Sequence, residues 1–188
     1  MSRKLIVFIA TSLDGYIATQ DDNLEWLLSS EGDGDNGYES FYNMVDTILL
    51  GRRTYDWILR EVGKDHFPYR GKRCCVFTST PAEKLDSVEF VSENVVSFTQ
   101  RLRLEEGGNI WVVGGGKLIR GLRENHMIDE WIVTIAPTLL GNGIPLFYLN
   151  DNEERLRLVG IRQYQQFVML DYLVQDSSDS KVSDNGNS

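Results

Sequence analysis

Cysteine and histidine are scarce in this sequence of 188 residues. The two cysteines, Cys74 and Cys75, are adjacent in a strand-like run, where neighbouring side chains point to opposite faces, so a disulfide between them would be strained. Neither the cysteines nor the isolated His66 and His126 have the spacing of metal ligands. We therefore expect no metal site, and free thiols in a reducing, cytoplasmic compartment.

Basic residues and long apolar runs are also too few for two classes of partner. The sequence has 19 Lys and Arg against 28 Asp and Glu, which gives a net charge of -9 and argues against a nucleic-acid-binding surface. No apolar run approaches the roughly 20 residues that a membrane-spanning helix needs. The first apolar run, residues 5–10, is short and breaks at residues 11–15, which indicates a strand rather than a signal peptide.

The length and the hydrophobic pattern predict one α/β domain over residues 1–175. Strands are predicted at residues 5–10, 47–50, 73–78, 88–91, 110–113 and 130–136, followed by an antiparallel hairpin at 155–163 and 166–174. Helices are predicted at residues 38–45, 98–106 and 117–123, with a further helix that ends near residue 61. Residues 11–26 and 29–37 are expected to be loops. The alternation predicts three layers around a mixed, mostly parallel sheet, and the polar residues 176–188 are predicted to be a disordered tail.

One predicted strand runs into three glycines and then into a helix, at residues 110–119. Glycines remove every side chain at the place where backbone N–H groups and the positive end of a helix dipole can bind an anion. A dinucleotide fingerprint would need glycine in place of Ile119, and a Walker loop would need serine or threonine in place of Leu118. The segment therefore predicts a phosphate site of another kind, with a simple tight turn as the alternative.

Two more predicted strands end in groups that suit a phosphate. Arg52 and Arg53 stand at a predicted helix start, and a guanidinium binds phosphate oxygens in a bidentate manner, although such a pair can also be a solvated surface feature. Residues 78–80 supply hydroxyls, which can equally serve a turn or a helix cap. Because the carboxyl ends of parallel strands share one edge of a sheet, two phosphate sites with hydroxyls between them predict a dinucleotide ligand.

Four segments, in this order, carry a resemblance to a known family. They are residues 12–18 (SLDGYIA), 46–55 (DTILLGRRTY), 112–116 (VVGGG) and 136–147 (APTLLGNGIPLF). The chain resembles the dihydrofolate-reductase-like superfamily, in the branch similar to the C-terminal reductase domain of bifunctional riboflavin-biosynthesis deaminase/reductase proteins. This resemblance implies an NADPH-dependent oxidoreductase, and it implies a cis peptide bond between Gly114 and Gly115.

The resemblance also implies which residues would bind NADPH. The glycine-rich segment would hold the pyrophosphate, the hydroxyls after residue 77 would meet the adenosine end, and the first two strands would flank the nicotinamide. The implied cofactor-binding residues are Ala10, Ile17, Gly51, Arg52, Arg53, Thr54, Thr78, Ser79, Val113, Gly114, Gly115, Gly116, Lys117 and Leu118.

Four residues are candidates for the chemistry. Thr134 matches a family threonine that faces the substrate. Trp26 would form an aromatic wall against a flat heterocycle, unless it packs in the core. Folate-reducing relatives use an acid that polarises the pterin, and the acids near that position are Glu39 and Asp14. A solvated glutamate at a helix start and an aspartate in a turn are the alternatives.

The resemblance implies a reductase of a small heterocyclic substrate, most like 5-amino-6-(5-phosphoribosylamino)uracil reductase. The H-x-E and P-C-x-x-C signatures of a zinc deaminase are absent from the sequence. The alternatives are a dihydrofolate or pterin reductase, a non-catalytic NADPH-binding module, and a scaffold that has lost its site. We also expect a homodimer, with Ile132, Ile144, Leu146 and Phe147 as a candidate interface.

Overall fold

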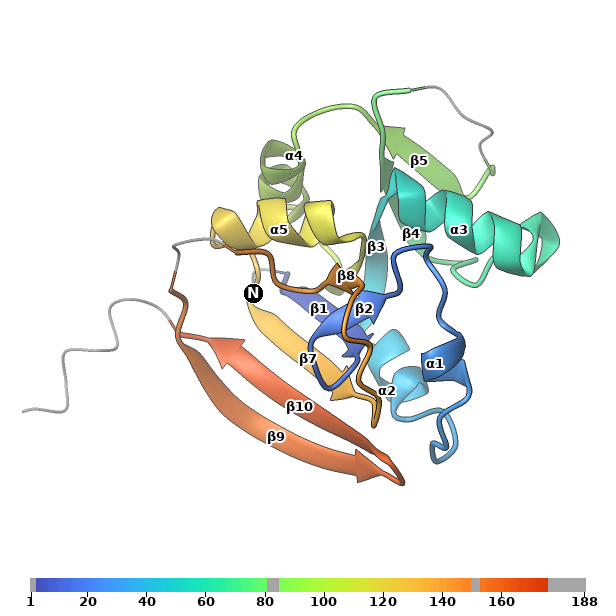
Figure 1. The fold of residues 1–188 in the computed structure, drawn as a ribbon. Coiled ribbons are helices and arrows are strands. Elements are labelled where there is room, and N and C mark those ends of the chain that lie inside the picture. The colour runs from blue at the N-terminus through green and yellow to red at the C-terminus, as the bar shows by residue number, and fades with distance from the viewer. Residues whose placement is uncertain (1–2, 81–84, 150–152, 176–188) are drawn as a thin grey trace, which may run out of the picture.

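Eight strands form one sheet in the order β5-β4-β3-β6-β1-β7-β10-β9 (Figure 1). The computed structural model describes residues 3–80, 85–149 and 153–175, so the predicted tail lies outside the described residues. The strands are β1 (Leu5–Thr11), β3 (Val45–Gly51), β4 (Arg73–Phe77), β5 (Val88–Val91), β6 (Asn109–Gly114), β7 (Glu130–Ile135), β9 (Leu156–Tyr164) and β10 (Phe167–Val174). From β5 to β7 all neighbours are parallel, and β10 and β9 add an antiparallel hairpin. The predicted mixed, mostly parallel sheet is confirmed.

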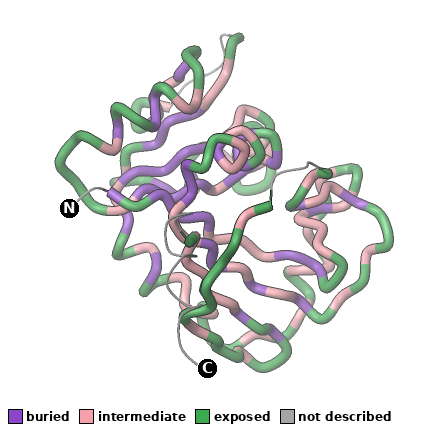
Figure 2. The backbone as a smooth tube through the Cα atoms, turned by 90° about the vertical axis from the view of Figure 1, so that its left-hand side faces the viewer, coloured by how far each residue is buried: buried purple, intermediate pink, exposed green. Residues whose placement is uncertain are grey.

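Helices cover both faces of this sheet and give the three predicted layers. Along β1, Leu5 and Val7 pack with side chains of α4 (Val95–Leu102) and α5 (Gly116–Glu124). Ile6 points the other way, into the cluster formed with α2 (Tyr38–Tyr42) and α3 (Arg52–Val62). Strands buried on both faces read as continuous apolar runs, which is why these strands were predictable. Figure 2 shows the buried positions gathered in the centre of the molecule.

The two cysteines lie on opposite faces of β4, as the strand geometry predicts. Cys74 belongs to the cluster beneath α2 and α3, and Cys75 belongs to the cluster beneath α4 and α5. Both are free thiols, and burial raises the pKa of each to about 12. They are therefore packed as small apolar side chains and are protonated at neutral pH.

The prediction of a continuous loop at residues 11–26 is wrong in two places. A short strand, β2 (Tyr16–Ala18), pairs with β8 (Ile144–Pro145), a partner more than 120 residues away in the sequence. A single turn of helix, α1 (Glu25–Leu28), begins at the end of the segment. Elsewhere, a short 3-10 helix, η1 (Lys64–His66), follows α3. Three residues of strand carry too little periodicity to be read without their partner.

Two predicted helices have shifted bounds. α4 begins at Val95 rather than Phe98, because the side chain of Asn94 accepts hydrogen bonds from the N–H groups of Val96 at 2.8 Å and Ser97 at 3.3 Å. An asparagine in this position caps the free N–H groups of a first turn. α2 ends at Tyr42, because Val45 already begins β3.

Two of the four predicted interface residues are buried, and Ile144 is half-buried. Ile132 is 4% exposed and Leu146 is 2% exposed, so both belong to the core, while Phe147 is half exposed at 50%. Exposed apolar side chains occur instead on the hairpin of β9 and β10, where Ile161 is 63% exposed and Leu158 is 46% exposed. Ile132 is covered because β7 lies between β1 and β10, whereas β9 is an edge of the sheet.

Candidate functional site

The carboxyl ends of β3 and β6 lie side by side and are built from glycine. Gly51 ends β3 and Gly114 ends β6, and the Gly114–Gly115 peptide bond is cis, as predicted. A Cβ atom placed on Gly51 would lie 3.3 Å from the nitrogen of Gly115, which is closer than ordinary contacts. The two strand ends can approach this closely because neither carries a side chain.

The next two glycines are equally enclosed. A Cβ atom on Gly115 would lie 3.2 Å from the hydroxyl oxygen of Thr54, and one on Gly116 would lie 3.0 Å from the ring of Tyr148. Gly114 has φ +141°, a conformation that side chains disfavour. The Thr54 side chain thus packs directly against the glycine-rich segment, so the two lie close enough to contact the same ligand.

Two helices begin at this edge of the sheet. α3 has 11 residues and starts directly after Gly51, and α5 has nine residues and starts directly after Gly115. The first N–H groups of a helix have no partner within it, and the helix dipole makes that end positive. The geometry therefore brings two anion-binding helix ends to adjacent strand ends.

Lys117 and Leu118 differ in what they offer to a ligand. Lys117 is exposed in the first turn of α5. Leu118 is 8% exposed and packs in the core, and its N–H donates to the carbonyl of Gly115 at 2.9 Å. Lys117 can contact a ligand at this edge, whereas Leu118 anchors the start of α5.

Both arginines of the predicted phosphate site form ion pairs. The Nε atom of Arg52 lies 2.7 Å from both carboxylate oxygens of Asp56, one turn further along α3. Arg53 reaches across to the loop before α1, where its guanidinium contacts the carboxylate of Asp22 at 2.7 Å. Each guanidinium must exchange or share a carboxylate to bind a phosphate.

The hydroxyls after β4 form a turn. The Thr78 hydroxyl donates to the carbonyl of Thr80 at 3.0 Å, and Ser79 between them is exposed. The guanidinium of Arg52 also contacts the Thr80 carbonyl at 3.4 Å. The end of β4 therefore lies next to the start of α3. The Thr78 hydroxyl stabilises a turn, which is the alternative role that the sequence offered for these hydroxyls.

Four more of the predicted site residues lie on strands β1, β2, β6 and β7. Ala10 of β1 is paired with Thr134 of β7, and Thr134 is 8% exposed. Val113 precedes the glycines and packs on the α3 side, while Ile17 of β2 packs on the α5 side. Ala10, Ile17 and Val113 are half-buried, so part of each remains open to a ligand.

Asp14 fixes a loop. Its carboxylate accepts hydrogen bonds from the Ser12 hydroxyl at 2.6 Å and from the N–H groups of Leu140 at 3.1 Å and Gly141 at 2.7 Å. The hydrogen bond from Ser12 is the main cause that lowers the pKa of Asp14. A carboxylate that stays ionised is a poor proton donor, so these contacts favour the structural role of Asp14.

Glu39 is exposed in the first turn of α2. A second acid, Asp35, lies four residues earlier and was not among the predicted residues. The Asp35 carboxylate accepts hydrogen bonds from the N–H groups of Glu39 at 2.5 Å and Gly37 at 3.0 Å, and the first of these lowers its pKa most. Asp35 caps the helix, which an aspartate four residues ahead of Glu39 could have signalled.

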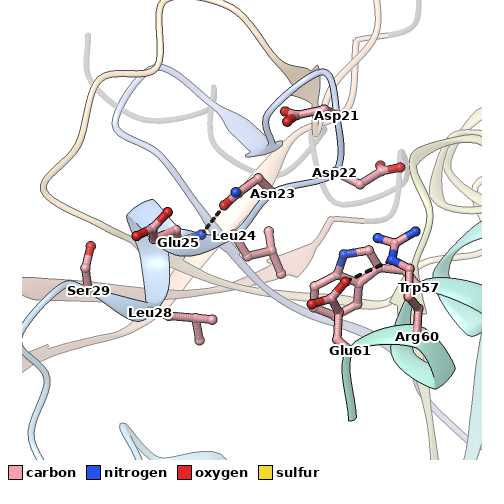
Figure 3. Close-up of a pocket in the computed structure, with 10 residues that line it drawn as sticks. All are labelled: Asp21, Asp22, Asn23, Leu24, Glu25, Leu28, Ser29, Trp57, Arg60 and Glu61. Carbon is pink, nitrogen blue, oxygen red and sulfur yellow. Dashed lines mark hydrogen bonds and ion pairs between the residues drawn. The ribbon is translucent and has the colours of Figure 1, made fainter. Parts of the chain in front are cut away.

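A cavity of about 510 Å³ lies between the loop that follows β2 and the outer face of α3 (Figure 3). Its lining residues are Asp21, Asp22, Asn23, Leu24, Glu25, Leu28, Ser29, Trp57, Arg60 and Glu61. A second hollow, of about 470 Å³, is lined by residues of the same loop and includes Trp26. The indole nitrogen of Trp26 is buried without a hydrogen-bond partner among the described residues. The first cavity has no signal in the sequence, because the segments that line it share no motif.

Neither a metal cluster nor a membrane-spanning helix occurs in the part of the chain that the structure describes. There, no group of three or more histidine, cysteine, aspartate or glutamate side chains could hold a metal ion. No helix in the same residues is long and apolar enough to cross a membrane.

These features define an α/β domain in which two helices begin at adjacent ends of parallel strands, at a topological switch of the sheet. The RibD C-terminal domain family matches residues 3–170, so the chain belongs to this family and has its dihydrofolate-reductase-like fold. The predicted family resemblance is confirmed.

Individual relatives agree with this assignment. The chain is 47% identical over 174 residues to "Uncharacterized protein YwjB" of Bacillus subtilis, covering 92% of this chain and 99% of that protein. The crystal structure of a protein from Shewanella sp. PV-4, named "Putative riboflavin biosynthesis protein", is 30% identical with a TM-score of 0.81, covering 94% of this chain and 100% of that one. A Thermotoga maritima deaminase/reductase shares the fold, with 17% identity and a TM-score of 0.68 over 93% of this chain and 57% of that chain.

Proposed function

We propose that this protein is an NADPH-dependent reductase of a small heterocyclic substrate. The observation that carries the proposal is the close approach of Gly51 and Gly115, directly after which α3 and α5 begin. Two helix ends and two arginines at adjacent strand ends suit the several phosphate groups of a dinucleotide. The chain's membership in a family of reductase domains supports the same assignment.

The residues at this edge fit the cofactor. Gly115 and Gly116 carry no side chain, so Thr54 and Tyr148 lie directly against the backbone at the start of α5, whose first N–H groups would bind the pyrophosphate. Arg52 and Arg53 would pair with phosphate oxygens, and the Thr78 hydroxyl would meet the adenosine end. When bound, NADPH supplies a hydride to an electrophilic carbon of the substrate.

A second group of residues would position the nicotinamide and the substrate that accepts the hydride. Ala10 and Ile17 would flank the nicotinamide, and the buried hydroxyl of Thr134 would hydrogen-bond the substrate beside it. Trp26 would cover one face of a flat ring and exclude water, which hydride transfer requires. Asp14 is ionised and engaged, so the proton that completes the reduction would come from solvent or from another group.

Two substrates are the first to test. The related Thermotoga structure is named as a 5-amino-6-(5-phosphoribosylamino)uracil reductase, and the Shewanella relative is named for riboflavin biosynthesis. A dihydropterin is the second candidate, because the fold is dihydrofolate-reductase-like. NADPH binding without turnover would identify the protein as a binding module.

The experiment measures substrate-dependent loss of NADPH absorbance with both compounds. We expect turnover with at least one of them, and we expect Thr134→Val, which keeps the shape and removes the hydroxyl, to lower kcat/KM by about 10-fold or more. Turnover with neither compound, in protein that binds NADPH, would contradict the catalytic part of the proposal.

A further inference from the structure

An aromatic side chain that is not among the predicted cofactor-binding residues lies against the start of α5. A Cβ atom on Gly116 would lie 3.0 Å from the hydroxyl oxygen of Tyr148 and 3.0 Å from its Cε2 atom. In a helix the Cα–Cβ bond is tilted toward the N-terminus, so a group this close to the Cβ position lies toward the N-terminal end of the helix. The Tyr148 hydroxyl is therefore beside the N–H groups that would bind the pyrophosphate.

The segment that carries Tyr148 is anchored to the rest of the fold. Figure 1 shows this segment, which follows β8, running back along α5. Leu146 is buried in the core, and its N–H donates to the carbonyl of Gly15 at 3.0 Å. The ring of Phe147 packs on the ring of Trp131, with 5.2 Å between the centroids. These contacts hold the two residues before Tyr148, so the fold itself places Tyr148 beside the start of α5.

Arg120 of α5 contacts the ring of Tyr148. Its guanidinium carbon lies 5.7 Å from the ring centroid, which is within the range of a cation–π interaction. The same guanidinium is paired with Glu124, one turn further along α5, at 2.7 Å. Gly116 and Arg120 are four residues apart and so share one face of the helix. The ring therefore lies along this face, with its hydroxyl directed toward the first turn.

The hydroxyl of Tyr148 is open to a ligand. The side chain is half-buried, and its hydroxyl forms no hydrogen bond with another residue in the described ranges 3–80, 85–149 and 153–175. A phenolic hydroxyl donates one hydrogen bond, and a donor bonds more strongly to a charged oxygen than to a neutral one. A phosphate at the N-terminus of α5 would supply such an oxygen.

We propose that Tyr148 is a further cofactor-binding residue, whose hydroxyl donates a hydrogen bond to the pyrophosphate at the start of α5. The inference rests on the proposed function and adds a contact to the same site. NADPH and NADH share the pyrophosphate, so Tyr148 contributes to the affinity for both nucleotides and not to the choice between them. Gly116 is then needed at its position because a side chain there would push the hydroxyl away.

The test removes the hydroxyl and keeps the ring. The wild type and Tyr148→Phe are titrated with NADPH and NADH by nicotinamide fluorescence, and by calorimetry with ADP, which has a diphosphate and no nicotinamide. We expect the variant to bind all three ligands about 5–10-fold more weakly, because one hydrogen bond to a charged oxygen is lost. The ratio of the NADPH affinity to the NADH affinity should not change.

Two further variants assign the effect to this contact. Tyr148→Ala, which removes the ring as well, should bind the three ligands at least as weakly as Tyr148→Phe. Tyr42→Phe is the matched control, because the Tyr42 ring packs against Trp111 in the cluster beneath α2 and α3, on the other face of the sheet from α5. This control should bind all three ligands as the wild type does. A melting curve for each variant separates a change in binding from a loss of fold.

The outcomes separate this inference from the proposed function. Unchanged affinity in Tyr148→Phe, tighter binding in Tyr148→Ala, a loss confined to NADPH, or an equal loss in Tyr42→Phe would overturn the inference and leave NADPH binding by the wild type intact. If the wild type binds ADP and neither dinucleotide, and Tyr148→Phe weakens ADP, the proposed function fails while the contact with a diphosphate stands. Binding of none of the three ligands by the wild type would contradict both.

Discussion

At the scale of single residues, the carboxylates that pair with Arg52 and Arg53 compete with a phosphate for the same guanidinium groups. Asp22 holds Arg53 from a loop, whereas Asp56 holds Arg52 from the same helix. The Arg53 side chain is 68% exposed, so this pair contributes little to the stability of the fold. The competition therefore affects ligand binding more than folding.

We predict that Asp22→Asn raises the affinity for NADPH by about 2–5-fold, because it frees Arg53 and removes a negative charge beside the phosphates. The measurement is a fluorescence titration of both proteins at low salt. In a double-mutant cycle the gain should disappear when Arg53→Ala is also present. An equal gain in the Arg53→Ala background would show that Arg53 does not receive the phosphate.

The buried thiols provide a second prediction at this scale. Because burial raises the pKa of Cys74 and Cys75 to about 12, almost none of either thiol is ionised at pH 8, and the thiolate is the reactive form. We predict that a thiol reagent modifies neither cysteine in the native protein at pH 8 and both in denaturant. Rapid native labelling at pH 8 would contradict the burial of these side chains.

At the scale of elements, the close approach of β3 and β6 depends on glycine at both strand ends. We predict that Gly51→Ala lowers the affinity for NADPH by about 10-fold or more and destabilises the fold by about 1–3 kcal/mol, because the new Cβ would lie 3.3 Å from the backbone of Gly115. The measurements are a cofactor titration and a chemical denaturation curve.

Gly121→Ala is the matched control within α5. A Cβ atom there would lie 3.7 Å from a methyl carbon of Val95, an ordinary contact, and alanine favours a helix interior over glycine by about 0.5–1 kcal/mol. We therefore predict that this variant is at least as stable as the wild type and binds NADPH equally. If both substitutions changed the stability and the NADPH affinity equally, the close approach of β3 and β6 would not be what makes glycine necessary at position 51.

Elements with long apolar runs were predictable, and elements defined by a distant partner were not. β5 and the hairpin follow the expected ranges closely, because short runs rich in apolar and β-branched residues between polar turns indicate strands even where, as in β9, the strand is exposed. β2 exists through its pairing with β8, and no local signal announces that contact. The start of α4 could have been read from Asn94, a capping residue that the periodicity alone does not include.

At the scale of the whole molecule, the hairpin leaves one face of the sheet edge uncharged and partly apolar. Its pairs Leu156–Val174, Leu158–Tyr172 and Ile161–Leu170 lie opposite each other, and such pairs share a face. In a protein of net charge -9, two copies approach with least repulsion through a surface without charge. We propose that this face meets a second copy of the chain, as two sheets pack in a sandwich.

The corresponding prediction concerns the mass in solution. We expect the wild type to sediment as a dimer and Ile161→Lys to sediment as a monomer, because a lysine would bring a charge into the interface. Leu104→Lys is the control, since Leu104 is 88% exposed in the loop after α4. A wild-type monomer at every concentration, or an equal loss of the dimer in both variants, would contradict the proposed interface.

The site was predictable from the sequence where its residues follow strands. The glycines, Thr54 and the arginines were found because their backbone position alone assigns them to the sheet edge. The contacts of these residues were not predictable. The Arg53–Asp22 ion pair and the cavity beside Trp57 form between segments that meet only in the folded chain. Asp14 was found as an acid, and only the hydrogen bonds to the 138–141 loop show what it does.

The central claim is that the edge formed by Gly51, Gly115 and the arginines binds NADPH. The most direct measurement is a titration of the purified protein with NADPH and with NADH, followed by nicotinamide fluorescence. We expect NADPH to bind in about the micromolar range and more tightly than NADH. Its affinity should fall roughly 10–100-fold in Arg52→Ala or Arg53→Ala, which corresponds to about 1.5–3 kcal/mol of charged hydrogen bonding. Binding of neither nucleotide would contradict the central claim.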